Sequence, residues 1–154
     1  MRRLFAIICI ALSVLSFKSD EQVNWLTFEE LENALTDKPK KVIISFYADW
    51  CVYCKKMEKA VYSKPDIIRQ LYQSYYAVKF NVESTDTIQF GGREFRNLNT
   101  GKKRRAFHQI PELLAGRENQ ELELPATVIL DQQFNIIKRY YRYLSPKEMA
   151  AFLK

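Results

Sequence analysis

Histidine and cysteine are scarce in this chain of 154 residues, which holds one histidine, His108, and three cysteines. A structural zinc site needs four ligands, usually from two Cys or His pairs. Outside the pair Cys51 and Cys54, the candidates are only Cys9 and His108. The sequence therefore disfavours a metal site, and a cysteine-based metal-binding module remains only as an alternative function.

Long apolar runs are scarce as well. One uncharged apolar run, residues 4–17, follows Arg2 and Arg3. A basic start before such a run is typical of a secretory signal peptide, and the run is shorter than the roughly 20 residues that span a bilayer. We expect residues 1–19 to be a signal peptide, with an uncleaved membrane anchor at residues 4–17 as the alternative. Residues 20–154 would then form one domain in the periplasm or another extracytoplasmic space.

The sequence also lacks a recognisable nicotinamide or flavin site, so we expect no cofactor. Reducing equivalents would then come from another protein or from a small thiol. The formal net charge is +6, and four of the cations form the run Lys102–Arg105. Such a run is most simply a solvated loop or helix face, so we expect no nucleic-acid partner.

The feature that organises the chain is an apolar strand followed by two closely spaced cysteines. The β-branched residues of Val42–Ile44 predict a buried strand over residues 41–47. Cys51 and Cys54 follow, and residues 53–61 are compatible with a helix. A cysteine at a helix N-terminus has a lowered thiol pKa, because unpaired N–H groups and the helix dipole favour the thiolate. This spacing predicts Cys51 as the nucleophile and Cys54 as the resolving thiol.

A purely structural role for the pair is disfavoured by the spacing. A disulfide that closes so short a loop constrains the unfolded chain little and adds little stability. The pattern therefore favours disulfide exchange over a stabilising cross-link.

Residues 48–55, Ala-Asp-Trp-Cys-Val-Tyr-Cys-Lys, resemble the active-site segment of the thioredoxin family, and are most similar to the C-terminal domain of DsbD-type proteins. The resemblance continues at Lys64–Asp66, at residues 124–131 and in the C-terminal helix. It implies an α/β thioredoxin-like fold, a central mixed sheet with helices on both faces. The segment 83–123 is longer than this fold needs, and predicts an inserted hairpin and helix before the strand that follows Pro125.

The function that the resemblance implies is thiol–disulfide oxidoreductase, with reduction of protein disulfides as the preferred direction. A disulfide-forming or isomerising enzyme is the alternative. The expected partners are disulfide-containing proteins and a membrane or small-thiol electron donor. We expect a monomer.

The resemblance also implies roles for residues around the thiols. The Leu124–Pro125 peptide bond would be cis and face the cysteines, presenting a backbone edge to an extended client segment. Trp50 would lie beside the active-site surface and contact substrate. Glu58 matches a carboxylate near the thiols, although its spacing equally fits a solvent-facing Glu paired with a Lys. The family's buried Asp, six residues before the first cysteine, is Ser45 in this chain.

The remaining sequence predicts an alternation of helices and strands. Thr27 and Ser145 each precede a Glu by three residues, the pattern of a capping box. Pro111 argues against an unbroken helix between residues 107 and 116. The other predicted elements are a helix over 27–36, a helix beginning near Pro65, a strand over 76–82, a hairpin over 87–95 with a Gly-Gly turn, strands over 126–130 and 134–141, and a final helix.

Overall fold

The computed structural model describes residues 22–154, and the predicted signal peptide lies outside them. Its main sheet has five strands in the order β1-β3-β2-β6-β7. The strands are β1 (Trp25–Leu26), β2 (Lys41–Tyr47), β3 (Tyr75–Asn81), β6 (Ala126–Leu130) and β7 (Ile136–Tyr140). Strands β1 and β2 run parallel to β3, whereas β6 runs antiparallel to β2 and β7 antiparallel to β6. The mixed sheet is therefore as predicted, with the two C-terminal strands antiparallel.

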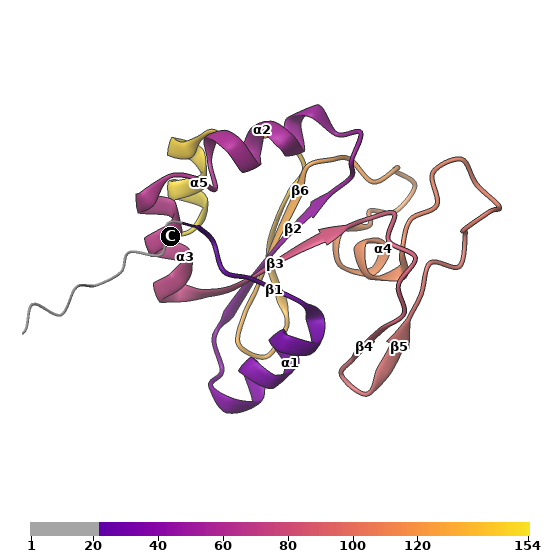
Figure 1. Cartoon of the computed structure of the whole chain (residues 1–154), viewed down its shortest axis with the longest axis horizontal. Helices are drawn as coiled ribbons and strands as arrows, with labels where there is room; N and C mark the ends of the chain where they lie inside the picture. Colours follow the sequence, from indigo (N-terminus) through magenta and orange to yellow (C-terminus); the bar gives the residue numbers. More distant parts are fainter. Residues whose placement is uncertain (1–21) are drawn as a thin grey trace, which may run out of the picture.

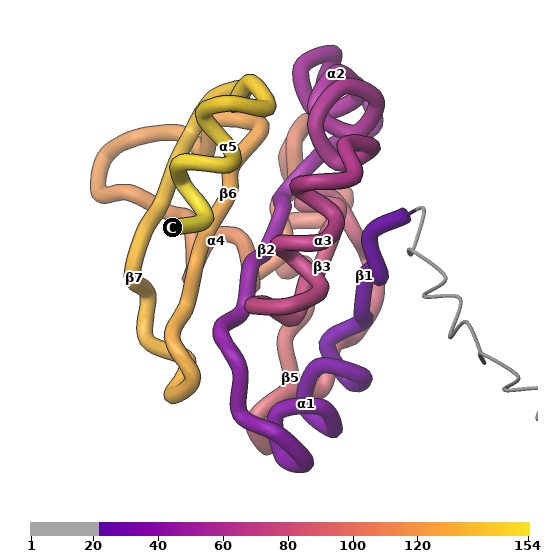
Figure 2. The backbone as a smooth tube through the Cα atoms, turned by 90° about the vertical axis from the view of Figure 1, so that its left-hand side faces the viewer, coloured from indigo at the N-terminus to yellow at the C-terminus, as the bar shows by residue number. Residues whose placement is uncertain are grey.

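Helices cover both faces of this sheet. They are α1 (Phe28–Asp37), α2 (Val52–Ala60), α3 (Pro65–Ser74), α4 (Gln109–Ala115) and α5 (Pro146–Phe152). Figure 1 shows α3 and α5 on one side of the strands and α4 on the other. Figure 2, turned by 90°, shows β7 and β1 at opposite edges. The predicted α/β architecture is confirmed.

Strand β2 lies at the centre because both of its faces are apolar. Its five residues 42–46 are all buried. Ile44 packs in the cluster that contains α1 and α4 residues, whereas Ile43 packs with residues of α2, α3 and α5. The Cys51–Cys54 pair at the start of α2 therefore follows shortly after a strand that is buried on both faces.

The helix starts agree with the capping patterns. Thr27 accepts the Glu30 N–H and the Glu30 carboxylate accepts the Thr27 N–H, which completes a capping box at α1. Ser145 and Glu148 make the same reciprocal pair at α5. Each box satisfies two N–H groups that a helix end leaves without partners.

The inserted segment forms the predicted hairpin and helix. Strands β4 (Ile88–Phe90) and β5 (Arg93–Phe95) pair antiparallel across Gly91 and Gly92, which have φ angles of 61° and 69°. Those positive angles suit the tight turn that glycine permits. The Phe90 ring meets Phe28 of α1 edge-on at 5.4 Å, so the hairpin packs against the main domain.

The prediction that Pro111 interrupts the helix was wrong. Pro111 is the third residue of α4, within the first turn. A proline is tolerated there because the N–H groups of the first turn have no intrahelical partner. Residues 109–115 therefore form one continuous helix. Within residues 22–154, no helix is both long enough and apolar enough to cross a membrane.

Candidate functional site

The two cysteines form a disulfide at the first turn of α2. The Cys51–Cys54 S–S distance is 2.09 Å and the two Cα atoms lie 5.3 Å apart. Cys51 is the N-cap residue, and its Sγ accepts the Cys54 N–H at 3.1 Å. The sulfur that was predicted to be nucleophilic thus lies where helix N–H groups and the helix dipole favour negative charge.

The segment before the helix holds Cys51 in this place. The Cys51 N–H donates to the Ala48 carbonyl at 3.0 Å, and the Cys51 carbonyl accepts the Lys55 N–H at 3.2 Å. Cys51 is 5% exposed and Cys54 is 8% exposed, so the oxidised sulfurs are both largely covered. Exposure therefore does not distinguish the two thiols, whereas the capping position of Cys51 does.

Trp50 lies at the surface beside the disulfide, with 46% of its area exposed. Its Nε1–H donates to the Glu83 carboxylate at 3.0 Å. The Arg105 guanidinium lies over the indole, 4.3 Å from the ring centroid. Both partners come from the segment 83–123, so the insert fixes the orientation of the tryptophan. Sequence reasoning missed Glu83 and Arg105, and the only available signal was the charge run at residues 102–105.

Further exposed side chains surround the disulfide on α2. Val52 is 74% exposed and Tyr53 is 59% exposed, although both are apolar or aromatic. The ring centroids of Tyr53 and Tyr143 lie 6.4 Å apart. The Lys56 Nζ lies over the Tyr143 ring, 4.7 Å from its centroid. An exposed apolar surface of this kind suits contact with another protein chain.

The Leu124–Pro125 peptide bond is cis, as predicted. Pro125 is buried at the start of β6 and lines a cavity of about 260 Å³ together with Cys54. Leu124 is partly exposed just before it. The chain thus brings Pro125 next to Cys54, although about 70 residues separate the two in sequence.

Glu58 lies on α2 at the same cavity. Its Oε1 accepts from Lys79 Nζ at 2.6 Å, and the Glu58 side chain remains 53% exposed. Glu58 therefore pairs with a lysine and lines the same cavity as Cys54, and its part in the thiol chemistry stays a prediction. Ser45, where the family has a buried Asp, is 5% exposed and lines the cavity.

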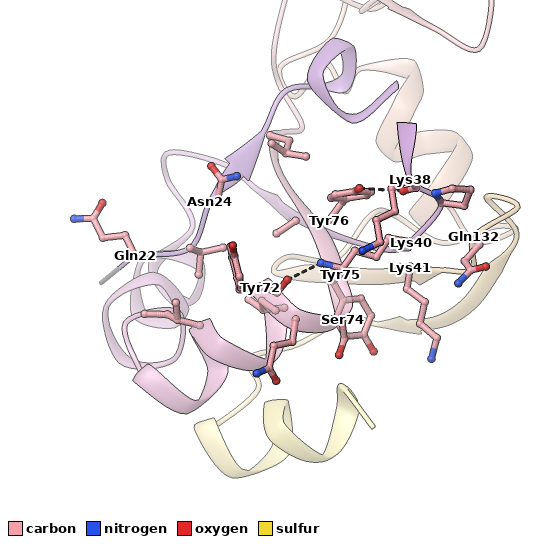
Figure 3. A pocket seen from close by; sticks show the side chains of 17 residues that line it. Gln22, Asn24, Lys38, Lys40, Lys41, Tyr72, Ser74, Tyr75, Tyr76 and Gln132 are labelled. Carbon is pink, nitrogen blue, oxygen red and sulfur yellow. Dashed lines mark hydrogen bonds between the residues drawn. The ribbon is translucent and has the colours of Figure 1, made fainter. Parts of the chain in front are cut away.

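A larger cavity, about 750 Å³, lies away from the cysteines and near the start of β2 and β3. Figure 3 shows Lys40 reaching the Tyr72 carbonyl across it, beside Tyr76. Burial, with a smaller effect from Lys38, lowers the pKa of Lys40. None of the predicted site residues lines this cavity, so its size does not mark it as the site of thiol chemistry.

The described residues contain no group of three or more His, Cys, Asp or Glu side chains that could hold a metal ion. His108 is fully buried and 5.1 Å from the Phe80 ring, and both of its ring nitrogens have backbone partners. His108 therefore has a structural place in the insert.

Comparison with known proteins agrees with this geometry. A family model described as a thioredoxin-like domain matches residues 28–154. The thiol:disulfide interchange protein DsbD of Cronobacter sakazakii is 46% identical over 46 residues, which is 29% of this chain and 8% of that protein. The Haemophilus ducreyi DsbD is 46% identical over 52 residues, 33% of this chain and 9% of that protein. The chain thus spans under a tenth of the length of these relatives.

Solved structures share the fold at low sequence identity. A structure described as DsbH oxidoreductase has a TM-score of 0.58 and 14% identity, covering 88% of this chain and 84% of that one. A thioredoxin from Thermus thermophilus has a TM-score of 0.59 and 16% identity, covering 86% and 85%. At these identities the likeness supports the fold alone.

Proposed function

We propose that this chain, which belongs to the thioredoxin-like domain family, is a thiol–disulfide oxidoreductase that reduces disulfides of client proteins outside the cytosol. The observation that carries this proposal is the Cys51–Cys54 disulfide at the N-terminus of α2. Nothing in its position is typical of a structural cross-link, because it bridges only a sequence separation of three residues.

The reaction consists of two exchange steps. In the reduced enzyme, the Cys51 thiolate attacks one sulfur of the client disulfide and releases the other client sulfur as a thiolate. Cys54 then attacks the Cys51 sulfur, restores the Cys51–Cys54 disulfide and releases the second client sulfur. Two electrons and two protons pass to the client. An upstream dithiol, either a membrane protein or a small thiol, must reduce the enzyme again.

Client binding is proposed for the surface around the disulfide. The backbone at Leu124 and Pro125 would pair with an extended client segment, which is the usual way a free edge recognises a peptide. Exposed Trp50 would cover the client next to its disulfide. The neighbouring exposed residues Val52 and Tyr53 would add apolar contact area.

The proposed compartment and the proposed reducing direction of the exchange reaction are both supported by the sequence. The basic start and the apolar run of residues 4–17 support export, and disulfides persist outside the cytosol. The similarity of residues 48–55 to the reducing domain of DsbD-type proteins supports reduction over oxidation.

The equilibrium reduction potential of the Cys51–Cys54 pair tests the direction. The full chain would be equilibrated in thiol redox buffers and its oxidised fraction measured by alkylation. We expect a value near that of thioredoxin, about −270 mV, which suits a reductase fed by an upstream donor. A value near −120 mV, typical of a strong oxidant, would instead make the chain a disulfide-forming enzyme.

A parallel assay tests the alternative that the chain is a metal-binding module and not an enzyme. The reduced chain would be mixed with a disulfide-containing protein, and also with zinc ions followed by gel filtration. Disulfide reduction supports the proposal. Stoichiometric metal retention without any exchange would make the chain a metal-binding module instead.

A further inference from the structure

Among the described residues, lysines and no carboxylates line the cavity of about 750 Å³ near the start of β2 and β3. The lysines are Lys38, Lys40 and Lys41. Within residues 22–154, none of the three takes part in a salt bridge. The volume falls in the range of about 300–1,000 Å³ that is usual for small-molecule sites. The charge of the lining therefore favours an anionic ligand.

Lys40 has a fixed position inside this cavity. Its Nζ donates to the Tyr72 carbonyl and lies over two aromatic rings, 5.3 Å from the Tyr76 centroid and 6.0 Å from that of Tyr72. Figure 3 shows the Lys40 side chain pointing across the cavity, whereas Lys41 points away from it. An ammonium group has three N–H donors, and the Tyr72 carbonyl takes one of them. The other two can donate to a ligand.

A second ammonium group lies close enough to Lys40 to repel it. Burial and, to a smaller extent, the charge of Lys38 lower the pKa of Lys40. A cation that is partly removed from water and faces a like charge is stabilised when an anion joins it. A ligand with two negative charges would offset both lysines at once. This preference for a dianion points to a phosphate group, which lysine binds as a point charge.

Neutral polar side chains extend the lining on both sides of the lysines. Asn24 precedes β1, Ser74 ends α3, and Gln132 lies between β6 and β7. Figure 3 shows Asn24 and Gln132 at opposite ends of the cavity, with Lys40 between them. Their amide groups can donate hydrogen bonds to oxygen atoms of a ligand. A ligand larger than inorganic phosphate is therefore needed to use both the lysines and the amides.

We propose that this cavity binds a phosphomonoester, with Lys38 and Lys40 on the phosphate group and the amide side chains on the organic part. The same chemistry is offered by a soluble phosphomonoester and by a phospholipid whose headgroup is a phosphomonoester. This binding goes beyond the proposed function, because it involves neither cysteine. Its success or failure is therefore independent of the exchange reaction.

The cavity lies at the end of the sheet opposite the disulfide. Lys41 is the first residue of β2, whereas Cys51 comes after Tyr47, the last residue of this strand. Gln22 also lines the cavity, and it follows the apolar run of residues 4–17 by five positions. Five residues span at most about 18 Å. A lipid headgroup in this cavity would place the lysine end of the domain at the bilayer and turn the disulfide away from it.

The test is a titration of the full chain with two probes, glycerol 3-phosphate and dihexanoylphosphatidic acid, at about 0.1 M salt. Binding would be followed by the nuclear magnetic resonance signals of the Lys40 ammonium and of the backbone at Tyr72 and Tyr76. We expect saturable shifts with a Kd below about 1 mM for at least one probe. Lys38→Gln with Lys40→Gln should weaken this binding about tenfold or more, because two charged contacts are lost.

Two controls separate the site from general charge and from apolar contact. Lys102→Gln with Lys103→Gln removes the same charge from a loop that does not line the cavity, so its Kd should stay within about twofold of the wild type. Dihexanoylphosphatidylcholine has the same acyl chains but no net charge, and it should not bind. If the double variant at the cavity does not fold, Lys38→Gln alone should weaken binding about three- to fivefold.

The two probes identify the source of the phosphate. Binding of glycerol 3-phosphate supports the proposal with a soluble ligand, and binding of dihexanoylphosphatidic acid alone supports it with a lipid headgroup. The proposal is overturned if neither probe gives a saturable shift up to about 10 mM. It is also overturned if the loop variant loses as much affinity as the cavity variant, or if the phosphatidylcholine probe binds equally well.

Discussion

The strand–helix unit of residues 41–60 and the insert of residues 83–123 reach their structures by different means. In the first, a buried strand, a capping cysteine and a helix follow one another directly in sequence. In the second, a buried histidine and side-chain bonds to the backbone hold short elements together. The backbone N–H of His108 donates to the Val82 carbonyl at 2.7 Å, and the ring Nδ1 of His108 accepts the Ile110 N–H.

The two regions therefore differ in their roles: one carries the reactive sulfurs and the other supports them by packing. The strand–helix unit carries both sulfurs, whereas the insert contributes contacts to Trp50 and part of the core that contains Phe28 and Phe46. Damage to the unit should therefore remove exchange, and damage to the insert should mainly remove stability.

The largest expected effect is on the thiols. Cys51→Ser should reduce exchange to the background of the assay, because the nucleophile is lost, while Cys54→Ser should trap a mixed disulfide with the client. Neither should lower the free energy of unfolding of the oxidised protein by more than about 2 kcal/mol, because the disulfide that is lost closes only a very short loop. Non-reducing gels and thermal melts measure both. Trapping by Cys51→Ser instead of Cys54→Ser would reverse the assigned roles.

The next effect is on the insert. His108→Ala should lower the free energy of unfolding by about 2–4 kcal/mol, because it removes two ring hydrogen bonds, one of which caps α4, and empties a filled core position. Urea unfolding measures this change. The reduction potential should stay constant. His108→Asn, which can still cap α4, should lose less. Equal losses for the two variants would mean that packing alone matters at this position.

The stability of the wild type should also depend on pH through His108. Burial lowers the pKa of His108 below its usual value. Ile110 N–H donates to Nδ1, so protonation would remove an acceptor. The unfolded chain binds the proton first, so stability is complete above about pH 6.5 and falls as the pH drops below that value. In His108→Ala this part of the decline should disappear.

The smallest effect joins the two regions. Arg105→Ala removes the guanidinium from the Trp50 ring, a contact worth roughly 0.5–1 kcal/mol at an exposed site. Exchange with protein clients should slow about two- to fivefold, whereas exchange with a small disulfide should not change. Arg104→Ala, one residue away and also exposed, is the matched control. If Arg104→Ala slows exchange equally, the effect comes from the loss of one positive charge and not from the loss of the contact with Trp50.

Local patterns in the sequence accounted for much of the fold. The capping residues Thr27 and Ser145, the glycine pair of the hairpin and the apolar run of β2 each act within a few residues, so their structures follow from nearby chemistry. The prediction at Pro111 failed because a proline breaks a helix in its interior but not in its first turn. The sequence pattern did not show that the helix begins after His108. The cis bond before Pro125 was predicted through family resemblance rather than from its neighbours.

The sequence alone determined where the sulfurs sit, because strand, capping cysteine and helix are contiguous and their geometry is local. Only the tertiary structure decided what surrounds them. Glu83 and Arg105 contact Trp50 from the insert. Thr127 on β6 is the direct partner of Ser45 on the neighbouring strand β2. These contacts join residues 33 to 82 positions apart, and they arise only when the sheet and its helices pack. Packing, not periodicity, therefore gives the two cysteines their different surroundings.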